Sequence, residues 1–273
     1  MISANHPLRI TVDRLTTLYA DVPIAVGVPD ESGWVPASAV FAPGSTYLPA
    51  MLAAVAAAYQ TTHRDLPASF LCHRYNWTVA CAAVGAFLID RRLPSLDLAN
   101  VAIHLDDQGQ GDQIALVSGR FWTSAGDVAA AHPDALIEPS GAIDLTRVRR
   151  ELERHFEPVI DAIRANAPFG KRAMWLSLAD NCAWCLLEFG QRLQRPGSRQ
   201  REIEEFVGGP DSRLRGGTRL ITIEAAGKSH AFVERGSCCL SYKLPETGYC
   251  HTCPLLKPEQ RAERLRNYVT SAS

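Results

Sequence analysis

The sequence predicts an α+β protein with a mainly helical body, small antiparallel β elements and a C-terminal cysteine-rich lobe. Residues 68–90, 145–166 and 171–193 are either apolar on almost every face or carry apolar residues at helical spacing. Short β-favouring runs joined by turn-like connections predict two hairpins, at residues 100–105 with 113–117 and at residues 220–224 with 230–234. Four of the eight cysteines fall between residues 235 and 254, which sets the C-terminal part apart from the body.

Composition and charge narrow the class of protein. The chain has 273 residues, 47% hydrophobic and 21% charged, enough for one large core or two modest domains. Its formal net charge of -1 provides no field that attracts a nucleic acid, so we expect no nucleic-acid partner. The longest strongly apolar run, residues 78–89, is shorter than the roughly 20 residues of a spanning helix, which predicts no transmembrane segment. Because residues 1–9 lack the basic start and apolar run of a secretory signal, we expect a cytoplasmic protein.

The N-terminal part of the chain contains three expected helices. Residues 7–20 and 48–61 carry apolar residues three and four positions apart, and each run predicts a helix. Between them, the proline and glycine density of residues 22–46 predicts a long loop or several short turns without a regular element. Pro67 can open a third helix that continues to Asp90 and should be the buried central helix.

Two long helices are expected in the second half of the body. Residues 145–166 form an amphipathic pattern that Asp144 or Thr146 can cap. Pro158 should kink or split this helix, because a proline inside a helix removes a hydrogen bond and clashes with the preceding turn. Residues 171–193 predict the second helix, and we expect the two to pack as an antiparallel pair.

Glycine and proline mark the passage from the body to the C-terminal lobe. Pro196-Gly197-Ser198 should end the preceding helix, and Gly208-Gly209-Pro210 breaks the chain again. We therefore predict a body at residues 1–210 and a lobe at residues 211–273. Residues 258–269 predict an amphipathic helix that closes the lobe against the body.

Four cysteines lie outside the lobe, and we expect them to be packed side chains. Cys72 and Cys81 belong to the predicted central helix, and free cysteines are among the most often buried residues. Cys182 and Cys185 have the spacing of a redox couple, but they lie in the middle of a predicted helix. They therefore lack the helix N-terminus that lowers a thiol pKa in thioredoxin-like sites.

The four remaining cysteines, Cys238, Cys239, Cys250 and Cys253, form the candidate metal site. Soft thiolate ligands in this number suit zinc or an iron–sulfur cluster. A single zinc ion is usually held by two cysteine pairs that each leave two to four residues between ligands. Adjacent side chains in extended chain point to opposite faces, so Cys238 and Cys239 are better placed to bind two separate irons. The spacing favours a 2Fe-2S cluster over zinc, and a disulfide pair or a zinc knuckle that only staples the lobe are the alternatives.

This pattern resembles the FhuF-type ferric-siderophore reductases. The resemblance rests on Cys-Cys-x10-Cys-x2-Cys, with Arg235 ahead of the first cysteine and Pro254 behind the last. It extends to an aromatic-rich helical stretch at residues 172–189, with Asp180-Asn181, and to the hairpin at residues 101–118. It implies an oxidoreductase of iron homeostasis, whose C-terminal iron–sulfur lobe passes one electron to a ferric siderophore for iron release inside the cell.

The resemblance and the cluster chemistry together indicate which residues act on the substrate. Hydroxamate oxygens are hard anionic ligands that hold ferric iron far better than ferrous iron, so reduction releases the metal. Hydroxamates are favoured over catecholates, whose ferric complexes are harder to reduce. Nearby positive charge from Arg235, Lys243 and His251 should raise the potential of an anionic cluster. The candidate siderophore contacts are Lys171, Arg172, Trp175, Arg235 and Lys243.

The expected partners follow from what the sequence lacks. No Gly-x-Gly-x-x-Gly follows a predicted strand, so electrons should come from a ferredoxin or a flavin-dependent reductase. Transient contact with a siderophore transporter is compatible with a protein that has no membrane span. The alternative function is a non-enzymatic, zinc-stapled module that binds a siderophore or a protein. An iron–sulfur sensor ranks last, because no nucleic-acid-reading motif is present.

Overall fold

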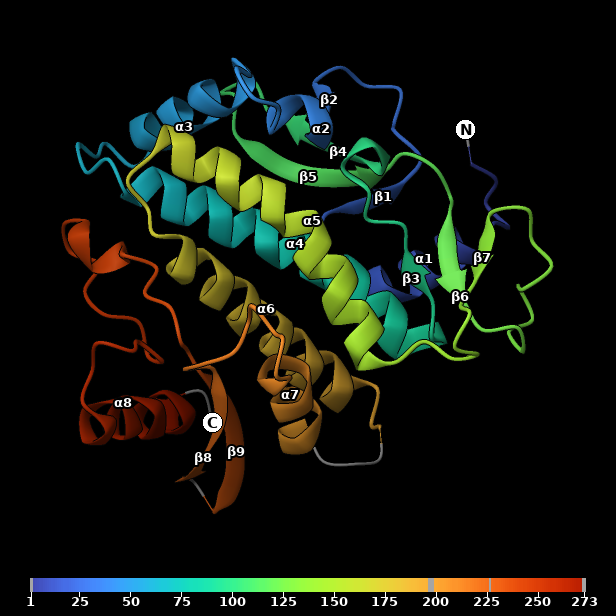
Figure 1. Ribbon diagram of the computed structural model, residues 1–273. Helices are drawn as coiled ribbons and strands as arrows, with labels where there is room; N and C mark the ends of the chain where they lie inside the picture. The colour runs from blue at the N-terminus through green and yellow to red at the C-terminus, as the bar shows by residue number, and fades with distance from the viewer. Residues whose placement is uncertain (1, 196–198, 226, 272–273) are drawn as a thin grey trace.

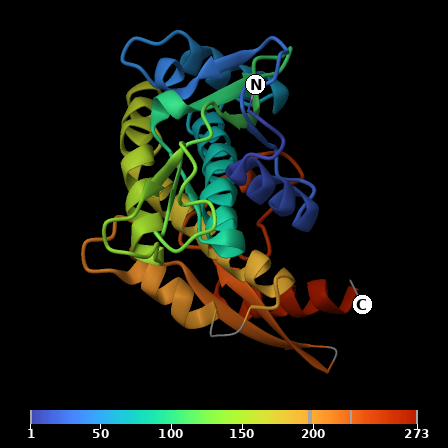
Figure 2. The ribbon, with the colours of Figure 1, turned by 90° about the vertical axis from the view of Figure 1, so that its right-hand side faces the viewer.

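The computed structural model describes residues 2–195, 199–225 and 227–271 and has the predicted α+β architecture (Figure 1). Three long helices form the middle of the molecule: α4 (Leu66–Asp90), α5 (Leu145–Asn166) and α6 (Lys171–Arg192). A four-stranded sheet lies at one end of these helices, and the C-terminal hairpin and last helix lie at the other (Figure 2). No helix in the described part of the chain is both long and apolar enough to cross a membrane.

Helix α4 is the predicted central helix and is buried along almost its whole length. Pro67 occupies its first turn, and Arg91 ends it in the left-handed conformation with φ of 54°. Its principal neighbour is α6, while α5 runs in the opposite direction to both (Figure 1). Helices α5 and α6 contact each other as the predicted antiparallel pair, and both also pack against α4.

Helix α5 begins as predicted at Asp144, whose carboxylate accepts a hydrogen bond of 2.7 Å from the Arg147 amide. The helix continues through Pro158, so the predicted split does not occur. The core buries Phe156 before the proline and Val159, Ile160 and Ile163 after it. This packing stabilises the helix on both sides of Pro158.

The four-stranded sheet contains the predicted hairpin of β4 (Val101–Leu105) and β5 (Gly111–Leu116). Strand β1 (Ile24–Val26) pairs parallel with β5, and β2 (Trp34–Pro36) pairs antiparallel with β4. The expectation that residues 22–46 hold no regular element is wrong, since they also form α2 (Ala37–Val40). The short strands take the two sheet edges, where a proline such as Pro36 breaks no ladder between two neighbours.

Shorter elements complete the body. Helices α1 (Pro7–Leu18) and α3 (Tyr47–Ala58) confirm two predictions. A three-stranded sheet that the sequence did not reveal has the order β3-β6-β7, with β6 and β7 parallel, so the β elements are not all antiparallel. Its strands and the 3₁₀ helix beside it are β3 (Leu93–Pro94), η1 (Leu98–Asn100), β6 (Phe121–Thr123) and β7 (Ala135–Ile137).

The C-terminal part has the predicted hairpin and closing helix. These elements are α7 (Arg199–Gly208), β8 (Arg219–Ala225), β9 (Lys228–Glu234), η2 (Ser241–Lys243) and α8 (Pro258–Ser271). The expected helix end at Pro196-Gly197-Ser198 lies outside the described residues. Leu214 and Val233 belong to the same hydrophobic core as the long helices, and the division into domains at residue 210 stays a prediction.

Candidate iron–sulfur centre

The four candidate ligands lie on one loop, residues 235–254, which we call the cysteine loop. It leaves β9 at Arg235, carries Cys238 and Cys239 into η2, and returns to a turn in which the Cys253 amide donates to the Cys250 carbonyl at 3.2 Å. Leu240 adopts a left-handed conformation with φ of 63°, which redirects the chain directly after the cysteine pair. The loop thereby brings Cys239 of the first cysteine pair into contact with Cys250 of the second.

Asp180 of α6 anchors the start of the cysteine loop. Its carboxylate is 3% exposed and accepts from the Gly236 amide at 2.7 Å and from the Ser237 amide at 3.0 Å. It also accepts from the hydroxyls of Ser237 and Thr218, both at 2.6 Å. A buried carboxylate with four such donors is satisfied only when strand β8 and the cysteine loop are both in place. The hydrogen bonds therefore tie the loop to the helical body.

The close approach of two glycines supports this anchor. A Cβ atom added to Gly217, which has φ of 92°, would lie 2.9 Å from the Gly236 Cα. A larger residue at Gly217 would push the start of the cysteine loop away from Thr218 and Asp180.

Further hydrogen bonds hold the rest of the loop. Ser69 of α4 donates to the Cys239 carbonyl at 2.9 Å, and the Lys243 ammonium lies 2.5 Å from the Asp65 carboxylate. Arg261 of α8 donates to the carbonyls of Cys253 and Leu256, both at 3.2 Å, and pairs with Glu234. The loop backbone is thus attached to α4, α6 and α8, which restricts where its sulfurs can lie.

The four sulfurs differ in exposure. Cys253 is 2% exposed, while Cys238, Cys239 and Cys250 are half-buried. A hydrogen bond with the Cys250 thiol lowers the pKa of Cys239, and the Ser241 hydroxyl at 3.2 Å and the Arg235 charge act in the same direction. The same contact raises the pKa of Cys250. The site therefore stabilises a thiolate at Cys239, the form in which cysteine binds metal.

The grouping of the four cysteines is consistent with an iron–sulfur cluster. A tetrahedral zinc places all four sulfurs about 3.8 Å from one another. Among the described residues, no three of the four cysteine sulfurs lie within 4.8 Å of each other, although Cys239 and Cys250 are in contact. Two irons require close pairs of sulfurs rather than a close set of four.

Arg235 provides a second test of whether the residues at this site suit an anionic iron–sulfur cluster. Its side chain is 14% exposed, its Nε lies 3.6 Å from the Asp180 carboxylate, and its charge acts on Cys239 and Cys250. Its Nε and Nη2 atoms are buried and have no hydrogen-bond partner in the structure. Buried charged donors without acceptors are costly. The thiolates and sulfides of an anionic cluster would supply the acceptors that these nitrogens lack.

We therefore expect Arg235→Gln to lower the midpoint potential of the bound cluster. The reduced cluster is more negative than the oxidised one, so a lost positive charge destabilises the reduced form more. A shift of roughly 60 mV corresponds to one tenfold change in a one-electron equilibrium, and we expect at least that size. Spectroelectrochemical titration measures it. Lys243→Gln is the matched control and should shift the potential less, because Asp65 already neutralises Lys243. Equal shifts in both variants would contradict this role for Arg235.

The predicted siderophore contacts are not brought together in the structure. Lys171 pairs with Asp161 at 2.5 Å, Arg172 donates to the carbonyls of Arg213 and Arg215, and Trp175 is buried at 7% exposure. None of these three lines a cavity beside the cysteine loop in the part of the chain described. Their contact with a siderophore stays a prediction, as does that of Lys243. Arg235 lines both cavities described next.

Two cavities adjoin the cysteine loop. The first, the sheet-side cavity, has a volume of 610 Å³ and lies between α3, α4 and the β4–β5 hairpin, with Cys239 and Arg235 in its wall. The second, the hairpin-side cavity, has a volume of 530 Å³ and lies between α4, α6, β9 and α8. His73, Trp77 and Arg235 border both cavities. Sequence reasoning missed them, because their walls combine residues from distant parts of the chain.

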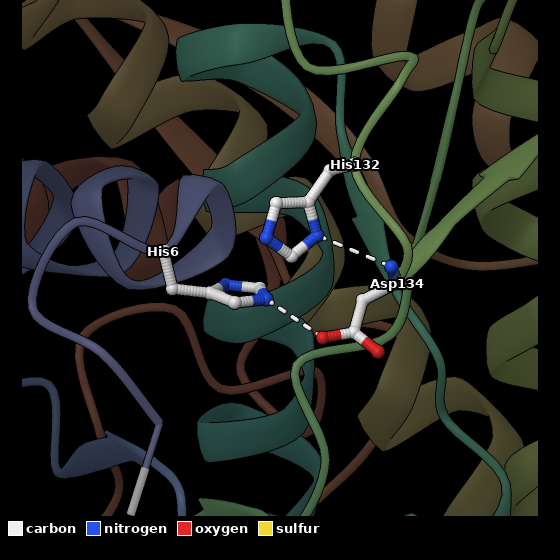
Figure 3. A group of neighbouring side chains, drawn as sticks. All are labelled: His6, His132 and Asp134. Carbon is white, nitrogen blue, oxygen red and sulfur yellow. Dashed lines mark hydrogen bonds and ion pairs between the residues drawn. The ribbon is translucent and has the colours of Figure 1, made fainter.

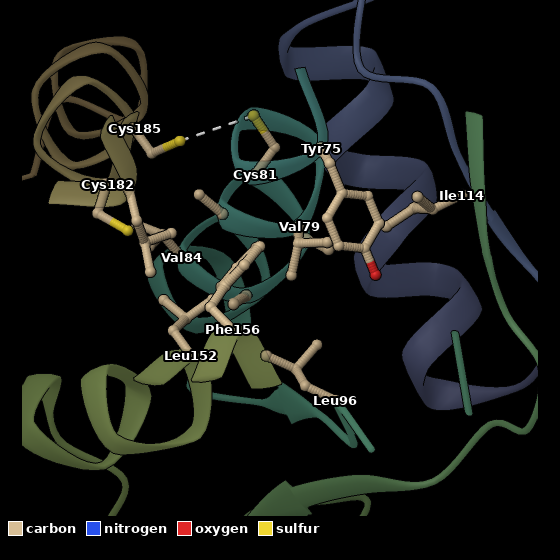
Figure 4. Packing of buried hydrophobic residues seen from close by; sticks show 14 of the residues in the cluster. Tyr75, Val79, Cys81, Val84, Leu96, Ile114, Leu152, Phe156, Cys182 and Cys185 are labelled. Atoms are coloured by element: carbon tan, nitrogen blue, oxygen red, sulfur yellow. Dashed lines mark hydrogen bonds between the residues drawn. The ribbon is translucent and has the colours of Figure 1, made fainter. Parts of the chain in front are cut away.

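The remaining cysteines are packed in the core, as predicted. Figure 4 shows Cys81 of α4 facing Cys182 and Cys185 of α6, with the sulfurs of Cys81 and Cys185 3.6 Å apart. Burial raises the pKa of Cys182 and Cys185 and that of Cys72, the last to about 12. These thiols stay protonated at neutral pH and are poor metal ligands.

A second group of potential ligands, which the sequence analysis missed, lies far along the chain from the cysteines. His6, His132 and Asp134 place three ligand atoms within 4.8 Å of one another (Figure 3). Each imidazole accepts a backbone N–H at Nδ1, His6 from Leu8 and His132 from Asp134, both at 3.1 Å. In the neutral ring Nε2 then carries the proton, and His6 donates from it to Asp134 at 3.0 Å. This arrangement suits a structural hydrogen bond at the start of α1, because a metal needs the Nε2 lone pair.

The cysteine loop groups four cysteines on one C-terminal segment, an arrangement that is consistent with an iron–sulfur cluster. Comparison with known protein families found a match for this loop. Residues 235–255 match the family model described as the FhuF 2Fe-2S C-terminal domain. The matched segment contains all four cysteines of the site, so the predicted resemblance is confirmed for the cysteine loop. Comparison with curated proteins gave no match.

Proposed function

We propose that this protein is a ferric-siderophore reductase. The observation that carries the proposal is the position of Cys239, which belongs to the loop matching the FhuF 2Fe-2S domain and also borders the sheet-side cavity. A substrate in that cavity would lie against a cluster ligand without coordinating to the cluster. The cavity volume of 610 Å³ falls in the range of small-molecule sites, roughly 300–1,000 Å³.

The wall of the sheet-side cavity favours a hydroxamate substrate. Apolar side chains make up much of it, including Phe41, Met51, Val55, Phe70, Leu71 and Ile103. Its charged side chains among the described residues are Arg74, Arg235 and Asp106, and burial lowers the pKa of His73 to about 4, so His73 is neutral. Three monoanionic hydroxamates make a neutral ferric complex, whereas three catecholates leave a charge of -3. Burying a charge of -3 against so much apolar surface costs more than burying a neutral complex, so the apolar wall favours the hydroxamate complex.

The chain's own residues would hold the cluster, position the cysteine loop and bind the siderophore. Cys238, Cys239, Cys250 and Cys253 would hold the 2Fe-2S cluster, which when bound supplies one electron at a time. Asp180 holds the start of the cysteine loop in register with α6. The sheet-side cavity would hold the siderophore beside Cys239. Ferric iron in the siderophore gains one electron, and the hard hydroxamate oxygens then hold the ferrous ion weakly enough for release.

Electrons would come from outside the chain. A ferredoxin or a flavin-dependent reductase remains the proposed donor, and transient contact with a siderophore transporter would shorten the path of the substrate. Exposed Tyr242 and Tyr249, whose ring centroids lie 5.2 Å apart, flank the cysteines on the surface of the loop.

The test uses protein purified and chemically reduced without oxygen. Mixing it with a ferric trihydroxamate and a ferrous chelator should reoxidise the protein by one electron per chain and form the ferrous chelate. A ferric tris-catecholate should react far more slowly. Protein that stays reduced with several ferric hydroxamates and the chelator would refute the proposal.

A variant separates the cavity from the cluster. Gln113→Trp, which fills the sheet-side cavity from β5, should slow reoxidation by hydroxamates at least tenfold and leave the visible spectrum unchanged. Gln108→Trp in the exposed β4–β5 turn is the matched control and should react like the natural protein. If both variants react at the natural rate, the siderophore binds elsewhere.

A further inference from the structure

The hairpin-side cavity has two aromatic walls that come from different elements. Trp77 of α4 and Trp184 of α6 form one, with ring centroids 6.2 Å apart. Tyr268 of α8 forms the other with Phe232 and His251, at centroid distances of 6.4 Å and 5.0 Å. Both tryptophans are only partly buried, and Tyr268 is 49% exposed. Large aromatic rings left partly in water around one cavity indicate a surface for a ligand.

The shape and polar groups of the cavity narrow the ligand class. Aromatic side chains in the lining suit a planar ring, which can stack on them. Asn181 and Gln191 add amides to the wall and Thr252 adds a hydroxyl, groups that can pair with the carbonyls and imide of a heteroaromatic ring. The charged side chains in the wall are already paired, Asp180 with Arg235 at 3.6 Å and Glu188 with Arg192 at 2.6 Å, so neither carboxylate is left to hold a quaternary ammonium, the other ligand that aromatic cages bind.

The cavity also lies beside the cysteine loop. His251 and Thr252, which separate Cys250 from Cys253, contribute to its wall. Arg235, which acts on Cys239, borders it as well as the sheet-side cavity. A ring stacked against His251 would therefore lie one residue along the chain from a cluster ligand, while a siderophore in the sheet-side cavity would lie beside Cys239.

We propose that the hairpin-side cavity binds the isoalloxazine ring of a free flavin, which serves there as a reductant. The binding stands on the cavity alone, whereas the role as reductant rests on the proposed function. In the overall balance, one fully reduced flavin anion becomes oxidised flavin with loss of two electrons and one proton. Two ferric ions each accept one of these electrons. The cavity would thus let the protein use a small diffusible donor without a nucleotide-binding domain.

Riboflavin titration of the full-length protein tests the binding. Stacking on tryptophan quenches flavin fluorescence, so we expect saturable quenching with one riboflavin per chain. Trp184→Leu and Tyr268→Leu should each weaken binding at least tenfold. Tyr268 is half-exposed, so its variant keeps the core intact. Tyr59→Leu is the matched control, because Tyr59 is also an exposed aromatic residue but borders the sheet-side cavity. Riboflavin binding by this variant should be unchanged.

Three outcomes would overturn the inference. They are the absence of saturable quenching, quenching that survives both Trp184→Leu and Tyr268→Leu, and displacement of riboflavin by a ferric hydroxamate in competition. Chemical reduction with dithionite bypasses the flavin site, so it separates a failure of flavin binding from a failure of the proposed function. Tyr268→Leu reduced with dithionite should still react with a ferric hydroxamate at the natural rate. If the protein binds riboflavin but never reduces a siderophore, the flavin site is supported and only the proposed reductase function is refuted.

Discussion

We expect the natural protein, purified without oxygen, to carry about two irons per chain, and Cys253→Ser to lose the visible colour and most of this iron. Cys253 is the least exposed of the four candidate ligands, and Arg261 of α8 donates a hydrogen bond to its carbonyl. Serine is nearly the same size, so the loop can keep its conformation. Its hydroxyl, however, is a hard ligand that stays protonated at neutral pH, whereas the cluster needs a thiolate. Absorbance and iron analysis measure the loss.

The core cysteines provide the control. Cys182→Ala removes a buried sulfur from α6 and should cost about 1–2 kcal/mol of stability, yet the protein should keep the colour and iron of the natural chain. Loss of colour in this variant would overturn the packing assignment. One zinc per chain and no visible absorption in the natural protein would overturn the iron–sulfur assignment.

The helices and the C-terminal cysteine group were predictable from the sequence because their signals are local. The apolar period of residues 145–166 and the spacing of Cys238, Cys239, Cys250 and Cys253 can be recognised within short segments. Strands β1 and β2 were missed for the same reason. Each is only three residues long and forms because β4 or β5, more than 60 residues further on, offers a free edge.

Contacts between distant residues were beyond prediction. Asp180 lies 56 residues before Gly236, and nothing in the local pattern of α6 indicates that its carboxylate faces the cysteine loop. His6 and Asp134 are 128 residues apart, and the sheet-side cavity combines Phe41 with Cys239. The sequence identifies the candidate metal ligands, whereas the residues that position them and the cavities beside them depend on how α4 and α6 pack.

Asp180→Ala should therefore destabilise both the protein and its metal site, although Asp180 is not a ligand. The change leaves the Gly236 and Ser237 amides and two hydroxyls buried without their acceptor. Each unsatisfied buried donor costs about 1–3 kcal/mol, and relaxation recovers part of the sum, so we expect a loss of about 3 kcal/mol or more. Urea unfolding of the metal-free protein measures this loss separately from the cluster.

The metal site should respond in a way that general destabilisation does not explain. Without Asp180 the start of the cysteine loop loses its attachment to α6, and Arg235 loses the carboxylate 3.6 Å from its Nε. Under conditions where the variant stays folded, we expect iron release to a chelator at least tenfold faster than from the natural protein. Asp161→Ala on the surface of α5, which only removes a pair with Lys171, should release iron at the natural rate. If Asp180→Ala keeps its iron equally long, the cysteines alone hold the loop in place, and Asp180 contributes only to the stability of the fold.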